Sequence, residues 1–366
     1  MKFSILQQDL WPVLSAVSRS CGVRSQLPVL GNILLRTDQG KLKLSATNLE
    51  VGIVKSVKAE IIEEGEITVP SKTLTEVVAN LSGEKLEFSA SGEQLSINTS
   101  SFSSQMNGIS ASEFPTIPLI GKEAVKINPS ILQTSLPQVV FASAVDDSRP
   151  NIAGVLMEIK GKKLQLVATD GYRLAHKTIT VEEDSNFKAL VPRKTFEELS
   201  RLITEEEVDN VVISTSDDQN QIIFSFGETQ LSSRLIEGNF PAWEKIIPTE
   251  IKSRIVLDRA EVLKAVKLAS VFARSESNIV KLQNLPTKLV LTSEAKELGS
   301  QKKEIESQSE GEEIKIAFNT KYLQEALSVI GSSQAILELS GNLSAAVLKP
   351  MGEEGLEYII MPVNVS

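Results

Sequence analysis

Apolar residues recur along the chain with two periods, and stretches of the two periods alternate in the same order three times. Strict alternation with polar neighbours, as in residues 41–46, 163–168 and 288–291, predicts half-buried antiparallel strands. The apolar positions between Leu74 and Leu81 instead share one face of a helix. The pattern therefore predicts an α+β protein in which each third of the chain has several strands and two helices.

Three sequence features recur with a common period of roughly 120 to 126 residues. The first is a short strand leading into an amphipathic helix, predicted over residues 11–20, 133–144 and 261–273. The second is a strand end that opens another helix, at residues 68–72, 190–194 and 316–320. The third is an apolar residue followed by proline, at Pro115, Pro241 and Pro362.

These features divide the chain into three similar domains, predicted at residues 1–120, 121–250 and 251–366. The length of 366 residues is sufficient, because a domain usually has roughly 100 to 200 residues. In the second feature, Pro70 and Pro192 suit the first position of the helix that follows.

Composition limits the class of protein. No apolar run approaches the roughly 18 residues that a membrane span needs. The amino-terminal segment reaches Asp9 before any long apolar stretch forms, so we expect no secretory signal and a cytoplasmic protein. One cysteine, Cys21, and one histidine, His176, leave little for a thiolate or zinc centre, so no metal or cofactor is predicted.

The net charge of −9 argues against a protein that coats nucleic acid through bulk attraction. It does not exclude DNA as a partner. An acidic exterior is compatible with a basic lining, and a protein held on DNA by its topology needs little direct affinity.

Several segments resemble the bacterial DNA polymerase III beta subunit family, the beta sliding clamps. In the first third they are Leu-Pro-Val-Leu-Gly-Asn at residues 27–32 and Ala-Thr-Asn-Leu-Glu at residues 46–50. In the second third they are Ala-Thr-Asp-Gly-Tyr-Arg at residues 168–173 and Val-Pro-Arg-Lys at residues 191–194. The resemblance runs from Met1 to Pro362 with its motifs in the family's order.

The resemblance implies three repeated clamp domains per chain, with antiparallel sheets outside and two helices per domain inside. It implies a closed dimeric ring of head-to-tail chains, in which two helices per domain, three domains and two chains give twelve helices around the hole. The ring would encircle duplex DNA without sequence specificity and confer processivity on the replicative DNA polymerase. It would be non-catalytic, and a clamp loader would open it, since the chain has no GxxxxGK phosphate loop of its own.

A clamp must hold DNA without fixing its register, so basic groups that meet phosphates are expected. By resemblance, DNA contacts align with Arg24, Lys72 and Arg149. The helices expected around the hole carry further cations: Arg19, Arg193, Lys194, Arg201, Arg259, Lys264, Lys267 and Lys321. Any one of them could instead be an ordinary solvated side chain. Pro150 and Asn151 stand where some members have two aromatic residues, which puts a single-stranded DNA contact there in doubt.

The family binds short peptides rich in Leu and Phe in an apolar cleft between the second and third domains, and so recruits other replication and repair proteins. By motif, the lining of this partner-peptide pocket would be Ile152, Thr169, Gly171, Tyr172, Arg173, Leu174, Pro241, Ile246, Leu343, Ala345, Ile359, Met361 and Pro362. For Asp170-Gly171 the simpler reading is a hairpin turn, and for Met361 it is a core methionine. In many relatives the tail after Pro362 is both more basic and more apolar than it is here.

The dimer interface implied by the resemblance joins Met106 of the first domain to Val271 and Phe272 of the third. Two other functions remain open at this point. A hydrolase or nuclease is disfavoured by the single histidine and by the lack of a GxSxG motif, and Asp146, Asp147 and Asp170 suit solvated loops better than magnesium. A three-repeat protein scaffold without DNA is the second alternative, which the cations on the inner helices disfavour.

Overall fold

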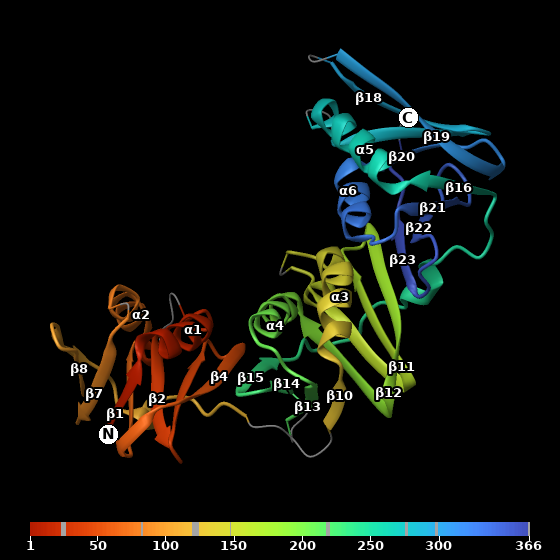
Figure 1. Ribbon diagram of the computed structural model, residues 1–366. Helices are drawn as coiled ribbons and strands as arrows, with labels where there is room; N and C mark the ends of the chain where they lie inside the picture. The colour runs from red at the N-terminus through yellow and green to blue at the C-terminus, as the bar shows by residue number, and fades with distance from the viewer. Residues whose placement is uncertain are drawn as a thin grey trace. The chain divides into compact units, whose positions relative to one another are not determined.

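A computed structural model describes residues 1–22, 27–81, 83–118, 124–146, 148–216, 220–274, 277–296 and 299–364. Within these ranges the chain forms six α-helices and 23 β-strands. The order of elements recurs three times (Figure 1): a strand, a helix, several strands, a second helix and three strands. The threefold repeat predicted from the sequence is therefore present in the structure.

The first repeat consists of β1 (Lys2–Leu6), α1 (Gln7–Ser18), β2 (Asn32–Asp38), β3 (Lys41–Thr47), β4 (Val51–Lys58), β5 (Glu60–Glu63), β6 (Glu66–Pro70), α2 (Ser71–Asn80), β7 (Lys85–Ser91), β8 (Gln94–Asn98) and β9 (Ser103–Asn107). The second consists of β10 (Ala124–Ile127), α3 (Pro129–Val139), β11 (Gly154–Thr169), β12 (Arg173–Pro192), α4 (Arg193–Glu205), β13 (Val211–Thr215), β14 (Gln221–Phe226) and β15 (Thr229–Arg234). The third consists of β16 (Ser253–Asp258), α5 (Arg259–Ala273), β17 (Ile279–Leu285), β18 (Lys288–Ala295), β19 (Gly299–Gly311), β20 (Lys315–Asn319), α6 (Thr320–Val329), β21 (Gln334–Leu339), β22 (Ala346–Pro350) and β23 (Leu356–Ile360).

Contacts divide the chain into two compact units that do not follow the three repeats. One unit contains Met1–Pro129 and Glu198–Leu235, and the other contains Ser130–Glu197 and Ile236–Ser366. The first unit holds a five-stranded sheet, β5-β1-β7-β8-β9, and an eight-stranded sheet, β10-β13-β14-β15-β4-β3-β2-β6. The second unit holds a ten-stranded sheet, β11-β12-β23-β22-β21-β16-β19-β18-β17-β20.

Two antiparallel strand pairs join strands of different repeats into one sheet. In the first unit β15 of the second repeat pairs with β4 of the first, with Gln230 opposite Val54. In the second unit β12 of the second repeat pairs with β23 of the third, with Leu174 opposite Ile359. The compact units follow these sheets, so the domain limits predicted at residues 120 and 250 stay a prediction.

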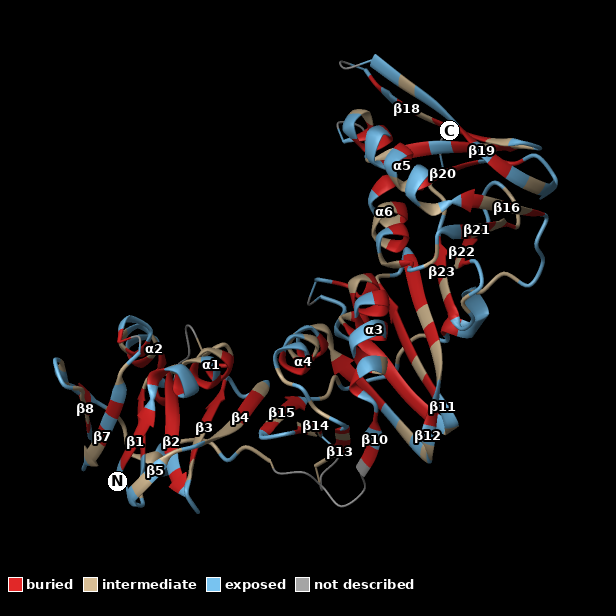
Figure 2. Cartoon of the chain, viewed as in Figure 1, coloured by how far each residue is buried: buried red, intermediate tan, exposed pale blue. Residues whose placement is uncertain are grey.

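The alternating pattern of the sequence corresponds to burial in the strands (Figure 2). In β8, Leu95 and Ile97 are fully buried while their neighbours along the strand are exposed or half-buried. On α2, Leu74 and Val78 are buried as the helical spacing predicts. In the first and third repeats the two helices contact each other, α1 with α2 and α5 with α6 (Figure 1).

Several predicted helix limits were wrong. Some prolines predicted to begin a helix are the last residue of a strand, and others lie inside a helix or begin it earlier than predicted. Pro70 and Pro192 are the last residues of β6 and β12, and α2 and α4 begin one residue later. The first helix begins at Gln7 and includes Pro12 within its second turn, although residues 11–20 were predicted. α3 begins at Pro129, where the missing amide hydrogen costs nothing, and not at residue 133.

The β12–β23 ladder begins at a close approach that only glycine permits. Gly355 has a φ of +78°, and a β-carbon there would lie 2.4 Å from the Thr178 carbonyl oxygen. Gly352 has a similar φ of +80° with open space around it. Alanine at either position meets the same backbone strain, but only at Gly355 does it also meet a steric clash.

We therefore expect Gly355→Ala to lower the free energy of unfolding by about 2 kcal/mol more than Gly352→Ala does. Urea denaturation of the two variants and the parent protein measures the difference. Equal losses in the two variants would show that the backbone at Gly355 shifts to accommodate the methyl group.

Candidate functional site

A tight turn between β11 and β12 begins the candidate site. The Asp170 carboxylate accepts hydrogen bonds from the amides of Tyr172 (2.9 Å) and Arg173 (3.0 Å). The Thr169 hydroxyl donates to the Arg173 carbonyl oxygen (2.6 Å) and accepts from the Gly171 amide (3.0 Å). Gly171 takes the left-handed conformation, with a φ of +92°. These bonds fix the turn and leave the Tyr172 side chain 59% exposed.

Arg173 is a buried cation with partners on three sides. Its Nε donates to Asp170 (3.1 Å), its Nη2 donates to the Phe141 carbonyl oxygen (2.9 Å), and its Nη1 pairs with Glu325 of α6. The guanidinium also lies 5.1 Å from the ring centre of Phe141 and 4.8 Å from that of Tyr322. Two carboxylates and two aromatic faces offset the cost of burying the charge, so Arg173 ties the turn to α6.

An apolar cluster adjoins the turn through Leu174. The β12–β23 register places Leu174 opposite Ile359, and Trp243 of the 3-10 helix η5 (Trp243–Ile246) packs into the same cluster. The buried members are Leu156, Val167, Leu174, Leu190, Trp243, Ala345 and Ile359, with Ile236, Phe240 and Ile247 packed against them. Residues of the second and third repeats therefore share one core here.

His176 closes one side of this core with a polar network. Its ring lies 4.4 Å from the Trp243 ring, measured between centroids. Its Nδ1 is 2.9 Å from the Glu357 carboxylate and its Nε2 is 3.0 Å from the Thr178 hydroxyl. The hydrogen bond with His176 lowers the pKa of Glu357, against the opposing effect of burial, and the charges of His176 and Lys349 lower it further.

Four apolar side chains stay exposed beside this buried cluster. They are Tyr172 (59% exposed), Ile246 (39%), Leu343 (61%) and Met361 (39%). The Met361 amide donates to the Tyr172 carbonyl oxygen (2.9 Å), so these two residues are neighbours. Exposed apolar side chains beside a rigid apolar floor are typical of a surface that binds a partner.

The remaining residues predicted to line the partner-peptide pocket form its floor and edges. Gly171 is exposed, and Pro241 and Pro362 are half-buried. The others are buried: Ile152, Thr169, Arg173, Leu174, Ala345 and Ile359. We refer to Tyr172, Ile246, Leu343 and Met361, with this floor, as the partner surface.

Arg149 lies next to the partner surface. It precedes the 3-10 helix η4 (Pro150–Ile152), and its Nη1 is 3.1 Å from the position that a β-carbon would take on Gly171. The sequence predicted Arg149 as a DNA contact, and the structure adds this proximity to the turn. Arg24, also predicted as a DNA contact, and Asp147 lie outside the described residues.

A lysine occupies the second position of the second helix in every repeat. These lysines are Lys72 in α2, Lys194 in α4 and Lys321 in α6, and all three are exposed. The partial positive charge of a helix N-terminus disfavours a cation in the first turn, so helix stability does not explain this recurrence. The amides of a helix N-terminus also suit a phosphate. Two further exposed lysines, Lys264 and Lys267, lie on α5.

The predicted arginines are more constrained than these lysines. Arg193 pairs with Glu197 at 2.7 Å, and Arg201 pairs with Glu198 at 3.3 Å. Arg19 donates to Glu198 at 2.8 Å and to Glu205 at 3.2 Å, and these two acids raise its pKa against the opposing effect of burial. Arg259 donates to the carbonyl oxygen of Leu327 within α6 and to that of Ser332, which follows α6.

The residues predicted for the dimer interface differ in exposure. Met106 lies in β9, an edge strand of the five-stranded sheet, and its side chain is buried. Val271 on α5 is 56% exposed, and Phe272 beside it is half-buried. An exposed apolar position on a helix is compatible with a contact between chains.

Family models of the DNA polymerase III beta subunit match the chain from end to end and in the order of the repeats. The N-terminal domain matches residues 1–118, the central domain residues 126–242 and the C-terminal domain residues 244–364. The chain belongs to the DNA polymerase III beta subunit family. The fold class and the non-catalytic, clamp-type subunit predicted from the sequence are thereby confirmed.

Similar proteins are beta sliding clamps along their whole length. The beta sliding clamps of Synechococcus elongatus and of a Synechocystis species are 32% and 30% identical, with all of both chains covered. The crystal structure of the Bacillus subtilis sliding clamp has a TM-score of 0.95 at 26% identity, again over both whole chains. That of the Thermotoga maritima beta subunit has a TM-score of 0.92 at 27% identity and the same coverage.

The described residues of this beta subunit show neither a metal site nor a membrane-spanning helix. No group of three or more His, Cys, Asp and Glu side chains among the described residues is arranged to hold a metal ion. No helix in the described ranges is long and apolar enough to cross a membrane. Asp146 accepts hydrogen bonds from Ser148, which lower its pKa.

The sequence did not predict the residues that hold Arg173 and His176 in place beneath the partner surface. Phe141, Tyr322 and Glu325 hold Arg173, while Trp243 and Glu357 contact His176. They come from distant parts of the chain, and no spacing brings them together. The one available signal was rarity, since His176 is the single histidine of the chain and Trp243 is one of its two tryptophans.

The low pKa of Glu357 makes part of the stability depend on pH. A carboxylate whose pKa is lowered in the folded state stabilises it above the ordinary value of 4.5, and this contribution is lost as pH falls through the lowered pKa. We expect Glu357→Gln to lower the free energy of unfolding by about 1 kcal/mol at pH 7. The difference from the parent protein should close below the lowered pKa.

Urea denaturation across the acidic range measures this difference, and Glu354→Gln at a nearby exposed position is the control. A gap between parent and Glu357→Gln that stayed constant down to the lowest pH would contradict the assignment.

Proposed function

We propose that this beta subunit forms a head-to-tail dimeric ring that encircles duplex DNA in the cytoplasm. The ring tethers the replicative DNA polymerase to its template and so confers processivity. A clamp loader driven by ATP opens it, and other replication and repair proteins reach DNA by binding to the partner surface. Family membership supports the sliding clamp, and the geometry of individual residues supports the finer statements.

The observation that carries the DNA contact is the recurring lysine at the second position of α2, α4 and α6. Lys72, Lys194 and Lys321 each combine a cation with the amides of a helix N-terminus, which is a suitable place for a phosphate. Because phosphates are the same at every base pair, such contacts hold DNA without fixing its register. Lys264 and Lys267 on α5 extend the same chemistry.

The proposed contacts are weak and depend on salt, as a mobile clamp needs. Each phosphate contact releases counterions, so direct affinity falls steeply as the salt concentration rises. A net charge of −9 keeps the remaining surface from adding to that affinity. Retention on DNA would then come from ring closure.

The proposed seam of the ring joins the edge strand β9, near Met106, to α5, near Val271 and Phe272. Among the described residues β9 is an edge strand of the five-stranded sheet, and such edges are the natural place for another chain to add. Val271 and the neighbouring Leu268 are exposed apolar residues on α5. A seam of this kind gives the loader a place at which to open the ring.

We expect a variant with Lys72, Lys194 and Lys321 all changed to Ala to remain folded but to be loaded poorly on DNA. The measurement is retention on nicked circular DNA in gel filtration, with a cognate clamp loader and ATP, before and after the circle is linearised. The parent clamp should stay on circles in high salt and leave linear DNA by its ends. The variant should load at least about threefold less, since each exposed charge contact is weak.

The control changes Lys58, Lys162 and Lys303 to Ala, which removes the same charge from exposed strand positions, one in each repeat. Thermal stability of the helix variant should equal or exceed that of the parent, because the removed cations oppose the helix dipole. Equal loss of the parent clamp from circles and linear DNA would contradict the ring and favour a scaffold without DNA. Equal loading by both triple variants would contradict the helix contacts.

The partner surface suits a short peptide rich in Leu and Phe. Its exposed side chains are apolar and lie beside a floor held in place by the β12–β23 ladder and by Arg173. A floor that is already rigid spares the ordering cost that otherwise weakens peptide binding. Arg149, next to Gly171, offers a cation to the peptide main chain or its carboxylates.

We expect Leu343→Ala to weaken binding of a synthetic Leu- and Phe-rich peptide about tenfold while stability changes little. Loss of one central apolar contact costs about 1 to 2 kcal/mol in binding, whereas a side chain 61% exposed contributes little to folding. Fluorescence anisotropy measures the affinity. Ile62→Ala, at a position 62% exposed on β5, is the matched control, and equal effects of the two substitutions would contradict the assignment.

A further inference from the structure

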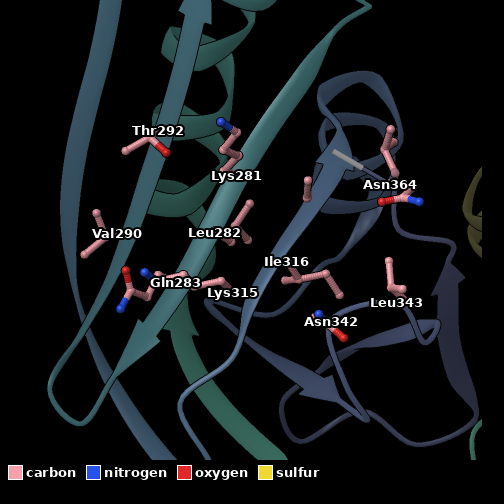
Figure 3. A pocket seen from close by; sticks show the side chains of 12 residues that line it. Lys281, Leu282, Gln283, Val290, Thr292, Lys315, Ile316, Asn342, Leu343 and Asn364 are labelled. Atoms are coloured by element: carbon pink, nitrogen blue, oxygen red, sulfur yellow. The ribbon is translucent and has the colours of Figure 1, made fainter. Parts of the chain in front are cut away.

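A groove of about 500 Å³ lies on the third repeat and extends from Leu343, a member of the partner surface. Figure 3 shows its lining side chains spread across β18, β17 and β20, toward the loop at Asn342 and Leu343 and toward Asn364. None of the exposed residues of the partner surface other than Leu343 lines it. The groove and the partner surface are therefore distinct sites that share one wall.

The strand register explains the floor of the groove. Thr292, Lys281 and Ala317 lie opposite one another on the three strands and form one row across the sheet. Val290, Gln283 and Lys315 form the next row on the same face, two residues further along each strand. The residue between them on β17, Leu282, is buried toward the other face.

The carboxyl-terminal tail forms the opposite wall. The Val363 amide donates to the Ala317 carbonyl oxygen (2.8 Å), so the tail runs beside β20. Ala317 is the smallest side chain in its row, and it leaves the hollow between Lys281 and the tail. A larger residue at this position would fill the groove.

The chemistry of the groove favours an acidic occupant. Lys281 and Lys315 both line it, while none of the twelve described residues around it carries a carboxylate. This is unusual in a chain with a net charge of −9. Lys281 keeps its side chain 48% exposed, with Glu294 at 3.7 Å outside the groove. The amides of Gln283, Asn342 and Asn364 can pair with the main chain of an extended segment.

We propose that this groove binds an acidic segment flanking the Leu- and Phe-rich core of partner peptides. The inference rests on the proposed function, since the core must sit on the partner surface for its flank to pass Leu343. A peptide that continues past Leu343 meets two lysines in a hollow already shaped by Ala317 and the tail. Partners with acidic flanks would thus bind in preference to partners with neutral ones, and their preference would fade in high salt.

The test uses the full-length clamp and three fluorescein-labelled synthetic peptides with the same Leu- and Phe-rich core. In the first peptide four Glu residues precede the core, and in the second four Glu residues follow it. In the third, Gln takes the place of Glu on both sides of the core. At low ionic strength we expect one of the acidic peptides to bind about three- to tenfold more tightly than the Gln peptide. The variant Lys281→Gln with Lys315→Gln should lose that gain and keep its affinity for the Gln peptide.

The control variant, Lys162→Gln with Lys163→Gln, removes the same charge from exposed positions on β11, which contributes no residue to the groove, and should keep the gain. Ala317→Leu, which fills the groove without changing charge, should lose it. Equal affinity for acidic and Gln peptides, or a gain that survives Lys281→Gln with Lys315→Gln, would overturn the inference and leave the proposed function intact. Failure of the parent clamp to bind the Gln peptide would instead overturn the proposed partner surface, and the inference with it.

Discussion

The ladder between β12 and β23 is the interaction on which the second unit depends. It pairs Arg173 with Ile360, Leu174 with Ile359 and His176 with Glu357, so one register sets three different features. The first pair brings the chain to the Arg173 network, the second closes the apolar floor, and the third forms the polar network against Trp243. A slip of one residue would turn every one of these side chains to the wrong face.

The segment that follows β23 is fixed by backbone hydrogen bonds to two other strands or turns. The Met361 amide bonds to Tyr172 at the end of β12, and two residues later the Val363 amide bonds to Ala317 on β20. The tail thereby connects the turn at one end of the ten-stranded sheet to the strand at its other end. The partner surface and the groove beside it are both bounded by this segment, so their geometries are coupled through a few backbone hydrogen bonds.

Much of the fold could be predicted from the sequence, because the elements of each repeat produce patterns that extend over only a few residues. Alternation placed the strands, and helical spacing placed Leu74 and Val78 on the buried face of α2. The errors at Pro70 and Pro192 were also local, since a proline before a helix suits a strand end as well as a first turn. Residues whose role is tertiary, such as Phe141 and Tyr322, gave no local signal. The pairing of β12 with β23 could not be predicted for the same reason, as its partners lie far apart in the chain.

Two groups of charged side chains differ in their surroundings: some have an opposite charge as partner, and others are exposed in the first turn of a helix. The buried Arg173 is matched by Asp170 and Glu325, and the helix arginines Arg193 and Arg201 have acidic neighbours on their own helix. Lys72 and Lys194 are exposed in the first turn of their helices, where the dipole opposes a cation, whereas Arg193 in the same turn of α4 pairs with Glu197. The proposed contact with phosphates would explain why two repeats place a lysine at this unfavourable position. In the ring proposed for this chain of net charge −9, a few such cations would guide DNA, and closure of the ring rather than affinity would hold it there.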